Sequence, residues 1–341
     1  MRNVRRWFVL GLVVWLGLGL GLGLGLDPRP ASAQEPAPAA PPLRWRFEKG
    51  EPPLLYRYAS KQTSEMTFAG APAGSEPARS RVDLRLDYRL SVQETDPATG
   101  VAQMLCRYEE VALAGEQVLL GKFAFDSATE DARLVDDPRL KPYAALVGLE
   151  FVFFLAPDGR VPEVRGLDKV RQAMLLGSED NPVAVHDVRT HFGDAAVRAQ
   201  LERSFHVVPD DPAAASGARW ARTVEAPVAL LGGVRHETAY VLAERDAGGT
   251  ARIAFETKLA KGETPPDPTV PQHGLVELTL VGGGGSGEIL FDAAAGRIAR
   301  SSQRVEMEVK ARLEMPEGRE PGQATSRVRM ESSLELLRSA K

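Results

Sequence analysis

The most metal-like spacing in the chain lies in the segment "HDVRTHFGD", which holds His186, Asp187, His191 and Asp194. On a helix, Asp187, His191 and Asp194 follow one another at steps of four and three, so they could share one face. The apolar stripe of this segment points elsewhere, which favours a solvated helix face with an ion pair between Asp194 and Arg198. Without an HExxH, a paired CxxC or a three-ligand spacing, metal binding here is the alternative interpretation, and we expect no metal and no cofactor.

Two further segments lack what their chemistry would require. The glycine run "VGGGGSGEIL" at 281–290 resembles a phosphate-binding loop, but Glu288 stands where Lys-Ser or Lys-Thr would follow the last glycine. The same glutamate replaces the last glycine of a GxSxG nucleophile motif, so Ser286 is not expected to react. We expect this run to form a hairpin loop between two strands. With no reactive constellation, the chain is expected not to be an enzyme.

The single cysteine, Cys106, lies in "AQMLCRYEE", where apolar residues recur at every second position. This spacing predicts a thiol on the buried face of a strand, where cysteine behaves as a small hydrophobic residue. One cysteine also excludes an internal disulfide bond. The folded part must therefore be stabilised by its own apolar core, for which it is long enough.

The N-terminal segment has the pattern of an export signal. Arginines open the chain, an uncharged apolar run follows at 7–26, and small residues stand at 31–33. We expect residues 1–33 to be a signal peptide, residues 34–42 to be a Pro/Ala linker, and the protein to be periplasmic or secreted. The alternative is that the apolar segment is retained as a membrane anchor, with the rest of the protein outside the cytoplasm. Twenty apolar residues are just long enough to span a bilayer.

The charge balance argues against one class of partner. The whole chain has a formal net charge of −4, and without residues 1–33 it would be about −7, since these carry four arginines and one aspartate. An acidic surface repels phosphates, so we expect no nucleic-acid partner. Contact with a membrane is expected through the export signal alone.

Long stretches of strict alternation predict strands with one wet and one buried face. They run over 81–93, 304–315 and 326–337. We expect helices at 137–148, begun by Asp137 as N-cap and ended by Gly148, and at 166–177 and 183–205.

These elements suggest one β-rich domain over 43–338, with a β-meander at 43–127, a helical middle at 136–206 and a second meander at 218–338. Within the first meander we expect a strand at 117–125. The predicted fold is α+β and mainly β, with a large curved antiparallel sheet, half-barrel-like, covered by short helices. The sheet could be continuous or consist of two similar halves side by side.

Two short stretches share a Gly-Arg-aliphatic triplet after a turn. They are "LAPDGRV", with Gly159, and "FDAAAGRI", with Gly296. Glycine supplies the positive φ that a tight reversal needs, and aspartate bonds the local backbone. We interpret both stretches as strand reversals rather than as a functional motif used twice.

The long strands present a large apolar sheet face. It includes Val82, Leu84, Leu86 and Tyr88 of one strand and three residues of another, Val305, Met307 and Val309. If the helices fill this face completely, it is core. If they do not, the remainder is an apolar groove of the kind that holds lipid or another apolar ligand.

Several segments in order resemble a family of exported bacterial proteins of planctomycete type whose function is unknown. The similarity rests on "LRWRFEKGEPPLLYRYASKQTSEM", "FAFDS", "GLEFVFFLAPDGRVPEVRGLDKV", "GARWARTVEAPVALLGGVRHETAYVLAE" and "GEILFDAAAGRIARSSQRVEMEV". It covers 43–337 and implies no catalytic residues. The order of meander, helices and meander is also similar to the half-barrels of periplasmic lipoprotein carriers, an architectural likeness.

From these observations we expect an exported non-enzymatic protein that binds an apolar or lipid-like ligand at the concave face of a curved sheet. The alternative is a cell-envelope interaction or scaffolding module with a filled core, no ligand and an envelope protein as its partner.

Overall fold

The computed structural model describes residues 41–72, 74–117, 121–137, 140–176, 182–228, 231–246, 248–265, 275–313 and 322–339. The predicted signal peptide and most of the predicted linker lie outside these ranges. In the described part, none of the helices is both long and apolar enough to cross a membrane.

Twelve strands form one antiparallel sheet. They are β1 (Leu54–Phe68), β2 (Ala78–Thr95), β3 (Ala102–Gln117), β4 (Gly121–Asp126), β5 (Glu150–Leu155), β6 (Val164–Arg165), β7 (Arg219–Val228), β8 (Gly232–Arg245), β9 (Thr250–Lys261), β10 (Leu275–Asp292), β11 (Arg297–Leu313) and β12 (Gly322–Ser339). The described helices are η2 (Ala132–Leu134), α1 (Lys141–Ala144), α2 (Leu167–Leu175), α3 (Pro182–His191) and α4 (Asp194–Phe205). The predicted fold class is thus confirmed.

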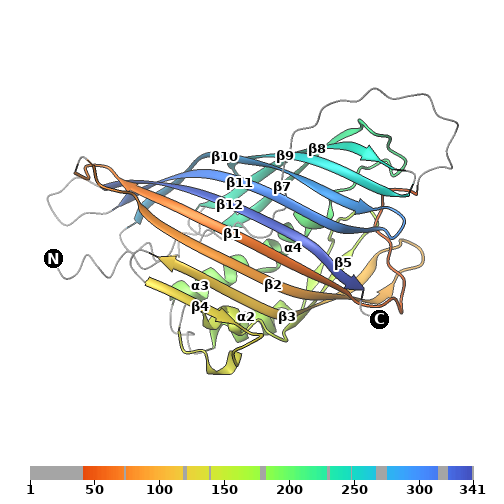
Figure 1. Cartoon of the computed structure of the whole chain (residues 1–341), viewed down its shortest axis with the longest axis horizontal. Coiled ribbons are helices and arrows are strands. Elements are labelled where there is room, and N and C mark those ends of the chain that lie inside the picture. The colour runs from red at the N-terminus through yellow and green to blue at the C-terminus, as the bar shows by residue number, and fades with distance from the viewer. Residues whose placement is uncertain are drawn as a thin grey trace.

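The first and last strands meet in the middle of the sheet. Its order is β6-β5-β3-β2-β1-β12-β11-β10-β9-β8-β7, with β4 also pairing with β3 (Figure 1). β1 pairs with β12 along its whole length, so Tyr58 lies opposite Leu334. This pairing joins the two predicted meanders into a single sheet.

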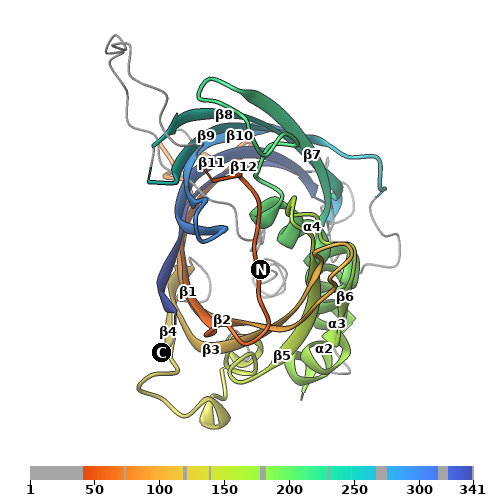
Figure 2. The same cartoon turned by 90° about the vertical axis from the view of Figure 1, so that its right-hand side faces the viewer.

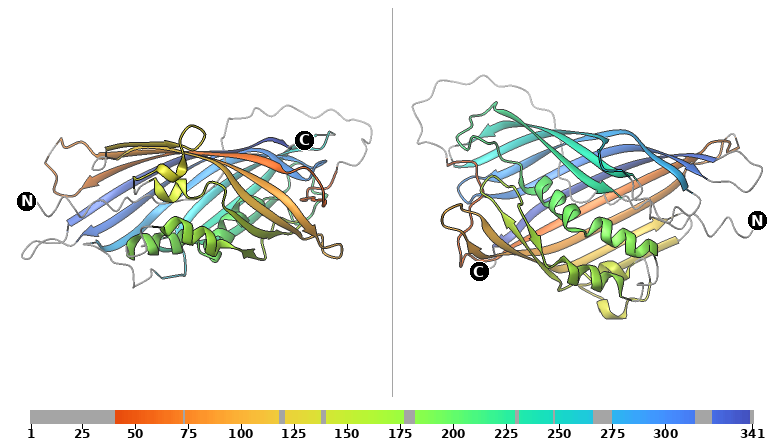
Figure 3. Two further views of the ribbon diagram at one scale, coloured as in Figure 1. Left: turned by 90° about the horizontal axis from the view of Figure 1, so that it is seen from below. Right: turned by 180° about the vertical axis from the view of Figure 1, so that it is seen from behind.

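The sheet curves strongly but does not close on itself. Helices α2, α3 and α4 lie between its two edges (Figures 2 and 3). α4 contacts both β6, at one edge, and β7, at the other. The helices therefore complete the enclosure that the sheet leaves open.

Alternating side chains explain why the sheet has one wet and one dry face. On β2, Leu84, Leu86 and Leu90 are buried on the concave side. On the outer side, charged residues of neighbouring strands pair directly, as Arg329 does with Glu306 (Nε–Oε1, 2.8 Å). Exposed pairs of this kind contribute at most about 1 kcal/mol each, so the apolar face carries most of the stability.

The sequence predicted a hairpin loop for the glycine run at 281–290. The structure shows instead that the run is part of the continuous strand β10. A Cβ atom at Gly283 would stand 2.6 Å from the carbonyl oxygen of Glu306, and one at Gly285 would stand 2.2 Å from that of Arg304. Residues without a side chain are needed here because the backbone of β11 approaches so closely. The expectation failed because glycine marks close approach as well as loops.

Two predicted helices and one predicted strand differ from the structure. At 137–148, Asp137 is not the N-cap, since α1 begins at Lys141 after the cap residue Leu140. The segment 183–205 is divided into α3 and α4 at Gly193, whose extended backbone (φ −68°, ψ 150°) interrupts the helical path. The expected strand at 117–125 corresponds to β4, whose described part begins at Gly121 and extends to Asp126, whereas Gln117 belongs to the end of β3.

The two Gly-Arg stretches are strand reversals, as predicted, with φ of +88° at Gly159 and +64° at Gly296. Residues 43–47, which we call the strap, connect them. The Trp45 N–H donates to the Pro157 carbonyl (2.9 Å), and the Arg46 N–H donates to the Gly296 carbonyl (3.1 Å). Figure 2 shows the red N-terminal part of the described chain crossing the end of the curved sheet. The strap thus covers one end of the enclosed space.

Candidate functional site

A cavity lies between the concave face of the sheet and the helices. Its empty volume is about 1030 Å³, including the part open to solvent. Strands β2, β3 and β5 line one side, α4 and the C-terminal end of α3 line another, and β7 and β8 complete the wall. The cavity therefore lies where the sheet, α4 and the edge strand β7 meet.

The strand side of the cavity is apolar and aromatic. Tyr88, Tyr108, Phe151 and Phe153 line it, with the thiol of Cys106 between them. The rings form a continuous wall, with centroids 6.2 Å apart for Tyr108 and Phe151 and 6.2 Å apart for Phe151 and Phe153. Period-two alternation in β3 and β5 places these side chains on the same face.

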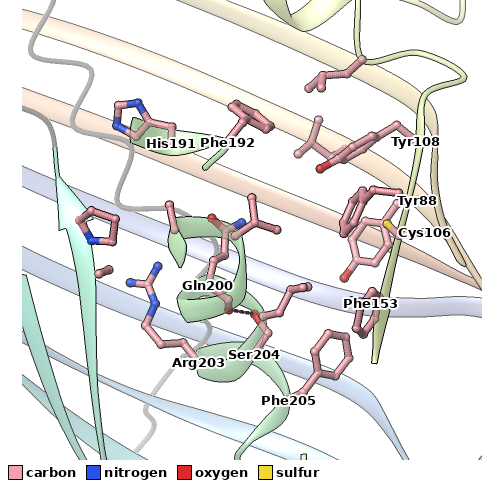
Figure 4. A pocket seen from close by; sticks show the side chains of 18 of the residues that line it. Tyr88, Cys106, Tyr108, Phe153, His191, Phe192, Gln200, Arg203, Ser204 and Phe205 are labelled. Carbon is pink, nitrogen blue, oxygen red and sulfur yellow. Dashed lines mark hydrogen bonds between the residues drawn. The ribbon is translucent and has the colours of Figure 1, made fainter. Parts of the chain in front are cut away.

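The helix side of the cavity carries polar groups. α4 presents Gln200, Arg203 and Ser204 to the cavity, and the Ser204 hydroxyl donates to the Gln200 carbonyl (3.0 Å). Nη1 of Arg203 lies 3.0 Å from Nε2 of His236, which belongs to β8. Figure 4 shows the aromatic side chains and the polar residues of α4 on facing sides of the cavity.

Burial sets the charge states of the lining residues. It lowers the pKa of Arg203 to about 10, which leaves the guanidinium charged at neutral pH. Burial, together with the neighbouring Arg203 charge, holds the pKa of His236 well below its usual value, so this imidazole is neutral. Burial also raises the pKa of the Cys106 thiol and of the Tyr108 phenol. The cavity thus carries one positive charge in a largely apolar wall.

A second cavity, of about 640 Å³, adjoins the same arginine and histidine. Tyr240, Phe255 and Val305 contribute to its lining on the sheet side. Arg203 and His236 border both cavities, so they stand at the junction between them.

The predicted apolar face is distributed over several environments. Leu86 and Tyr88 line the first cavity, and Val305 lines the second. The other predicted residues serve as packing: Leu84 is buried in the large core, Val82 is half-buried against it, and Met307 and Val309 belong to a second apolar cluster. Only part of the face therefore borders open space.

The histidine-aspartate segment does not form a common site. His191 lines the first cavity, whereas His186 contacts Thr190 (Nε2–Oγ1, 3.1 Å) beside a separate hollow. The predicted ion pair with Arg198 is wrong, because Asp194 pairs with Arg171 of α2 (Nη1–Oδ1, 2.9 Å).

The side chain of Asp187 lies outside the described part of the chain. Across that part, no three His, Cys, Asp or Glu residues are grouped so that they could hold a metal ion.

Sequence reasoning missed Arg203 and His236, although each left a signal. Arg203 continues the spacing of Ala196 and Ala199, two of the buried residues of α4, at steps of three and four, so it extends the apolar stripe. His236 lies on the inner face of β8 at period two with Val234 and Tyr240, both of which are buried. A charged or titratable residue in an apolar pattern marks a buried polar group.

The sequence matches a family model over residues 100–298, more than half of the chain. The protein belongs to a family of unknown function, DUF6263. Membership in a family without known function was expected and is confirmed. The planctomycete type and the likeness to lipoprotein carriers stay predictions. No curated protein matches this DUF6263 chain.

Several solved structures show weak similarity. One, described as lipid-protein interactions in lipovitellin, has 12% identity and a TM-score of 0.41 and covers 87% of this chain but 26% of that one. DynF, from the dynemicin biosynthesis pathway of Micromonospora chersina, has 10% identity and a TM-score of 0.18, covering 92% and 94%. The outer membrane protein OprG of Pseudomonas aeruginosa has 7% identity and a TM-score of 0.20, covering 84% and 96%. The DUF6263 chain spans about a quarter of the lipovitellin chain, and none of these similarities assigns a function.

Proposed function

We propose that this protein is exported, is not an enzyme, and binds an apolar or lipid-like ligand at the concave face of its sheet. The observation that carries the proposal is the cavity of about 1030 Å³ between the sheet and α4. Small-molecule sites are concave and mostly apolar with a few polar groups, and the lining of this cavity has that composition.

The composition of the wall supports an apolar ligand. Leu86, Leu90, Phe151 and Phe153 present hydrocarbon to the space, and Tyr88 adds a further ring. Apolar surface that a ligand covers contributes about 25 cal/mol per Å² removed from water. An apolar molecule that covers these side chains would therefore gain free energy here.

The charge states of the wall support a binding role rather than a catalytic one. Burial keeps the Cys106 sulfur protonated at neutral pH, whereas a thiolate is the nucleophilic form. Tyr88 and Tyr108 are likewise held as neutral phenols, because burial raises their pKa. None of these three groups is activated for nucleophilic attack.

Ligand binding is tested first on the purified protein. Native mass spectrometry of detergent-free protein should show a co-purified mass, and titration with an apolar fluorophore should saturate. Ala196 lines the cavity and is buried, so Ala196→Phe should fill part of it and weaken fluorophore binding. Ala239→Phe is the matched control, because Ala239 lies exposed on β8. Absence of both a bound mass and saturable binding would sink the proposal.

Export is tested separately by expressing the full chain and the chain without residues 1–33. N-terminal sequencing of the exported protein should begin at Gln34, after the predicted cleavage site. A mature protein that retains residues 1–33 in the membrane fraction would support the anchored alternative, and recovery of the full chain in the cytoplasm would contradict export.

A further inference from the structure

Arg203 carries a positive charge in a largely buried, apolar environment, where a charge without a counter-charge is unfavourable. Its guanidinium borders both cavities and therefore keeps some accessible surface, yet the surrounding protein is dense enough to lower its pKa to about 10. Its Nε atom is buried and donates to no acceptor within the described ranges. Its polar contact in those ranges is the imidazole of His236.

No described carboxylate balances this charge. Other partly buried arginines of the fold have such partners: Arg57 pairs with Asp87 (2.6 Å), and Arg222 pairs with Asp210 (2.8 Å). A charge removed from water without a counter-charge destabilises the folded state, and replacing it by an apolar residue is often neutral or stabilising. A position that keeps such a group at a cavity wall is a candidate for anion binding.

His236 can assist the same anion. The imidazole is neutral and 7% exposed, and both of its ring nitrogens lie near Nη1 of Arg203, Nε2 at 3.0 Å and Nδ1 at 3.5 Å. A neutral imidazole carries one N–H, so it can donate one hydrogen bond to an anion that lies beside the guanidinium. The pair therefore offers one full positive charge and several N–H donors at the junction of the two cavities.

The charge count selects among anionic head groups. Glu202 and Arg222 also line the second cavity, where Arg222 pairs with Asp210, whereas in the first cavity Arg203 is the charged residue among the described lining residues and no carboxylate accompanies it. A carboxylate carries one negative charge and matches the planar guanidinium fork. A phosphate monoester carries about −1.5 to −2 at pH 7 and would remain partly uncompensated.

We propose that the ligand is a long-chain monocarboxylate, with its carboxylate bound by Arg203 and His236 and its hydrocarbon tail in the aromatic cavity. The aromatic wall then covers the tail while the arginine neutralises the head group. This inference rests on the proposed ligand-binding function and goes further by naming the chemical class of the ligand and the residues that select it.

The test compares three probes that share one tail: hexadecanoate, hexadecanol and hexadecyl phosphate. Each displaces an uncharged apolar fluorophore from the full chain at pH 7.5. We expect hexadecanoate to bind about tenfold or more tighter than hexadecanol, the effect of a charge-assisted hydrogen bond. Arg203→Met should remove this preference while leaving the affinity for hexadecanol within about threefold.

Two further variants separate specific recognition from general attraction of anions. Arg198 is exposed on the same helix, so Arg198→Met removes an equal charge and should keep the preference for hexadecanoate. His236→Gln should reduce the preference but not abolish it, because Arg203 remains. Arg203→Met should unfold at the same urea concentration as the parent or a higher one, since it removes an uncompensated cation.

The outcomes distinguish this inference from the proposed function. Equal affinities for hexadecanoate and hexadecanol, or a preference that survives Arg203→Met, would overturn the carboxylate site while leaving apolar binding intact. Tighter binding of hexadecyl phosphate than of hexadecanoate would overturn the choice of head group.

If Arg203→Met does not fold, a reduced preference for hexadecanoate in His236→Gln supports the site, and an unchanged preference in that variant overturns it. Binding of the fluorophore but of none of the three probes would overturn the inference alone. Failure to bind either the fluorophore or a probe would overturn both.

Discussion

Trp45 is the anchor of the strap, and its removal should be among the most damaging single substitutions in the described chain. The side chain is 3% exposed, and its Nε1–H donates to the carbonyl of Phe205 at 2.8 Å. Its ring meets Phe205 and Phe291 edge-on, with centroid distances of 5.1 Å and 5.4 Å, and stacks on Phe47 at 5.8 Å. One residue thus connects the strap, the end of α4 and the end of β10.

The expected magnitude follows from these contacts. Truncation of a buried tryptophan to alanine costs about 3–5 kcal/mol, because transfer free energy is lost and a cavity remains. The hydrogen bond contributes a further ~0.5–1.5 kcal/mol, and its loss leaves the Phe205 carbonyl without this donor. We therefore expect Trp45→Ala to lower the free energy of unfolding by about 3.5–6.5 kcal/mol. Trp45→Phe keeps an aromatic ring and should lower it by about 1–2 kcal/mol.

Urea titration followed by far-ultraviolet circular dichroism measures both values. Trp220 provides a matched control, because its ring also stacks, on Tyr240 at 5.5 Å, but its Nε1 is buried without a partner in the described part of the chain. Trp220→Phe removes no hydrogen bond and should be neutral within about 0.5 kcal/mol. The reasoning is refuted if Trp45→Ala costs less than about 1 kcal/mol or if the two phenylalanine variants cost the same.

Three further predictions use the same unfolding assay or a simple chemical probe. His236 has a folded-state pKa well below its usual 6.5, so the unfolded state binds more protons and stability should fall as the pH drops through 6.5, by at most about 1.4 kcal/mol per unit. His236→Gln should flatten this dependence between pH 7.5 and 5, and an unchanged slope would contradict the buried neutral imidazole. Gly285→Ala should destabilise by about 1–3 kcal/mol, since its Cβ would stand 2.2 Å from a backbone oxygen of Arg304, whereas Gly282→Ala meets nothing within 4 Å and should be tolerated. Cys106 should react with a water-soluble thiol reagent far more slowly in the native protein than in urea, because burial raises the pKa of its thiol, and equal rates would show an exposed thiol.

The parts of the fold that sequence reasoning predicted are those in which local pattern and burial coincide. In β2 and β11 a charged residue alternates with an apolar one, and the structure places the charged set outside and the apolar set inside. The reversals at Gly159 and Gly296 were likewise readable, because few residues other than glycine adopt a positive φ. Both signals depend on a few neighbouring residues.

The predictions from sequence were wrong where the conformation of a segment is set by its packing against a distant part of the chain. The glycine run looked like a loop, yet Gly283 and Gly285 are small because β11 passes over them. The segment 183–205 looked like one helix, yet it bends at Gly193 so that α4 can reach the edges of the sheet. Local sequence propensity does not indicate where another strand approaches the backbone closely, or where packing bends a helical segment.

The sequence by itself determined the long amphipathic strands, the negative net charge, the lone buried thiol and the class of the fold, because each depends on composition or on short-range periodicity. Only the tertiary structure decided that β1 pairs with β12, that helices stand between the edges of the sheet, and that a cavity remains inside. The same holds for Arg203 and His236, which lie 33 positions apart in the chain and 3.0 Å apart in space. Such contacts depend on how the strands are ordered and curved, which is a property of the whole chain and not of any segment.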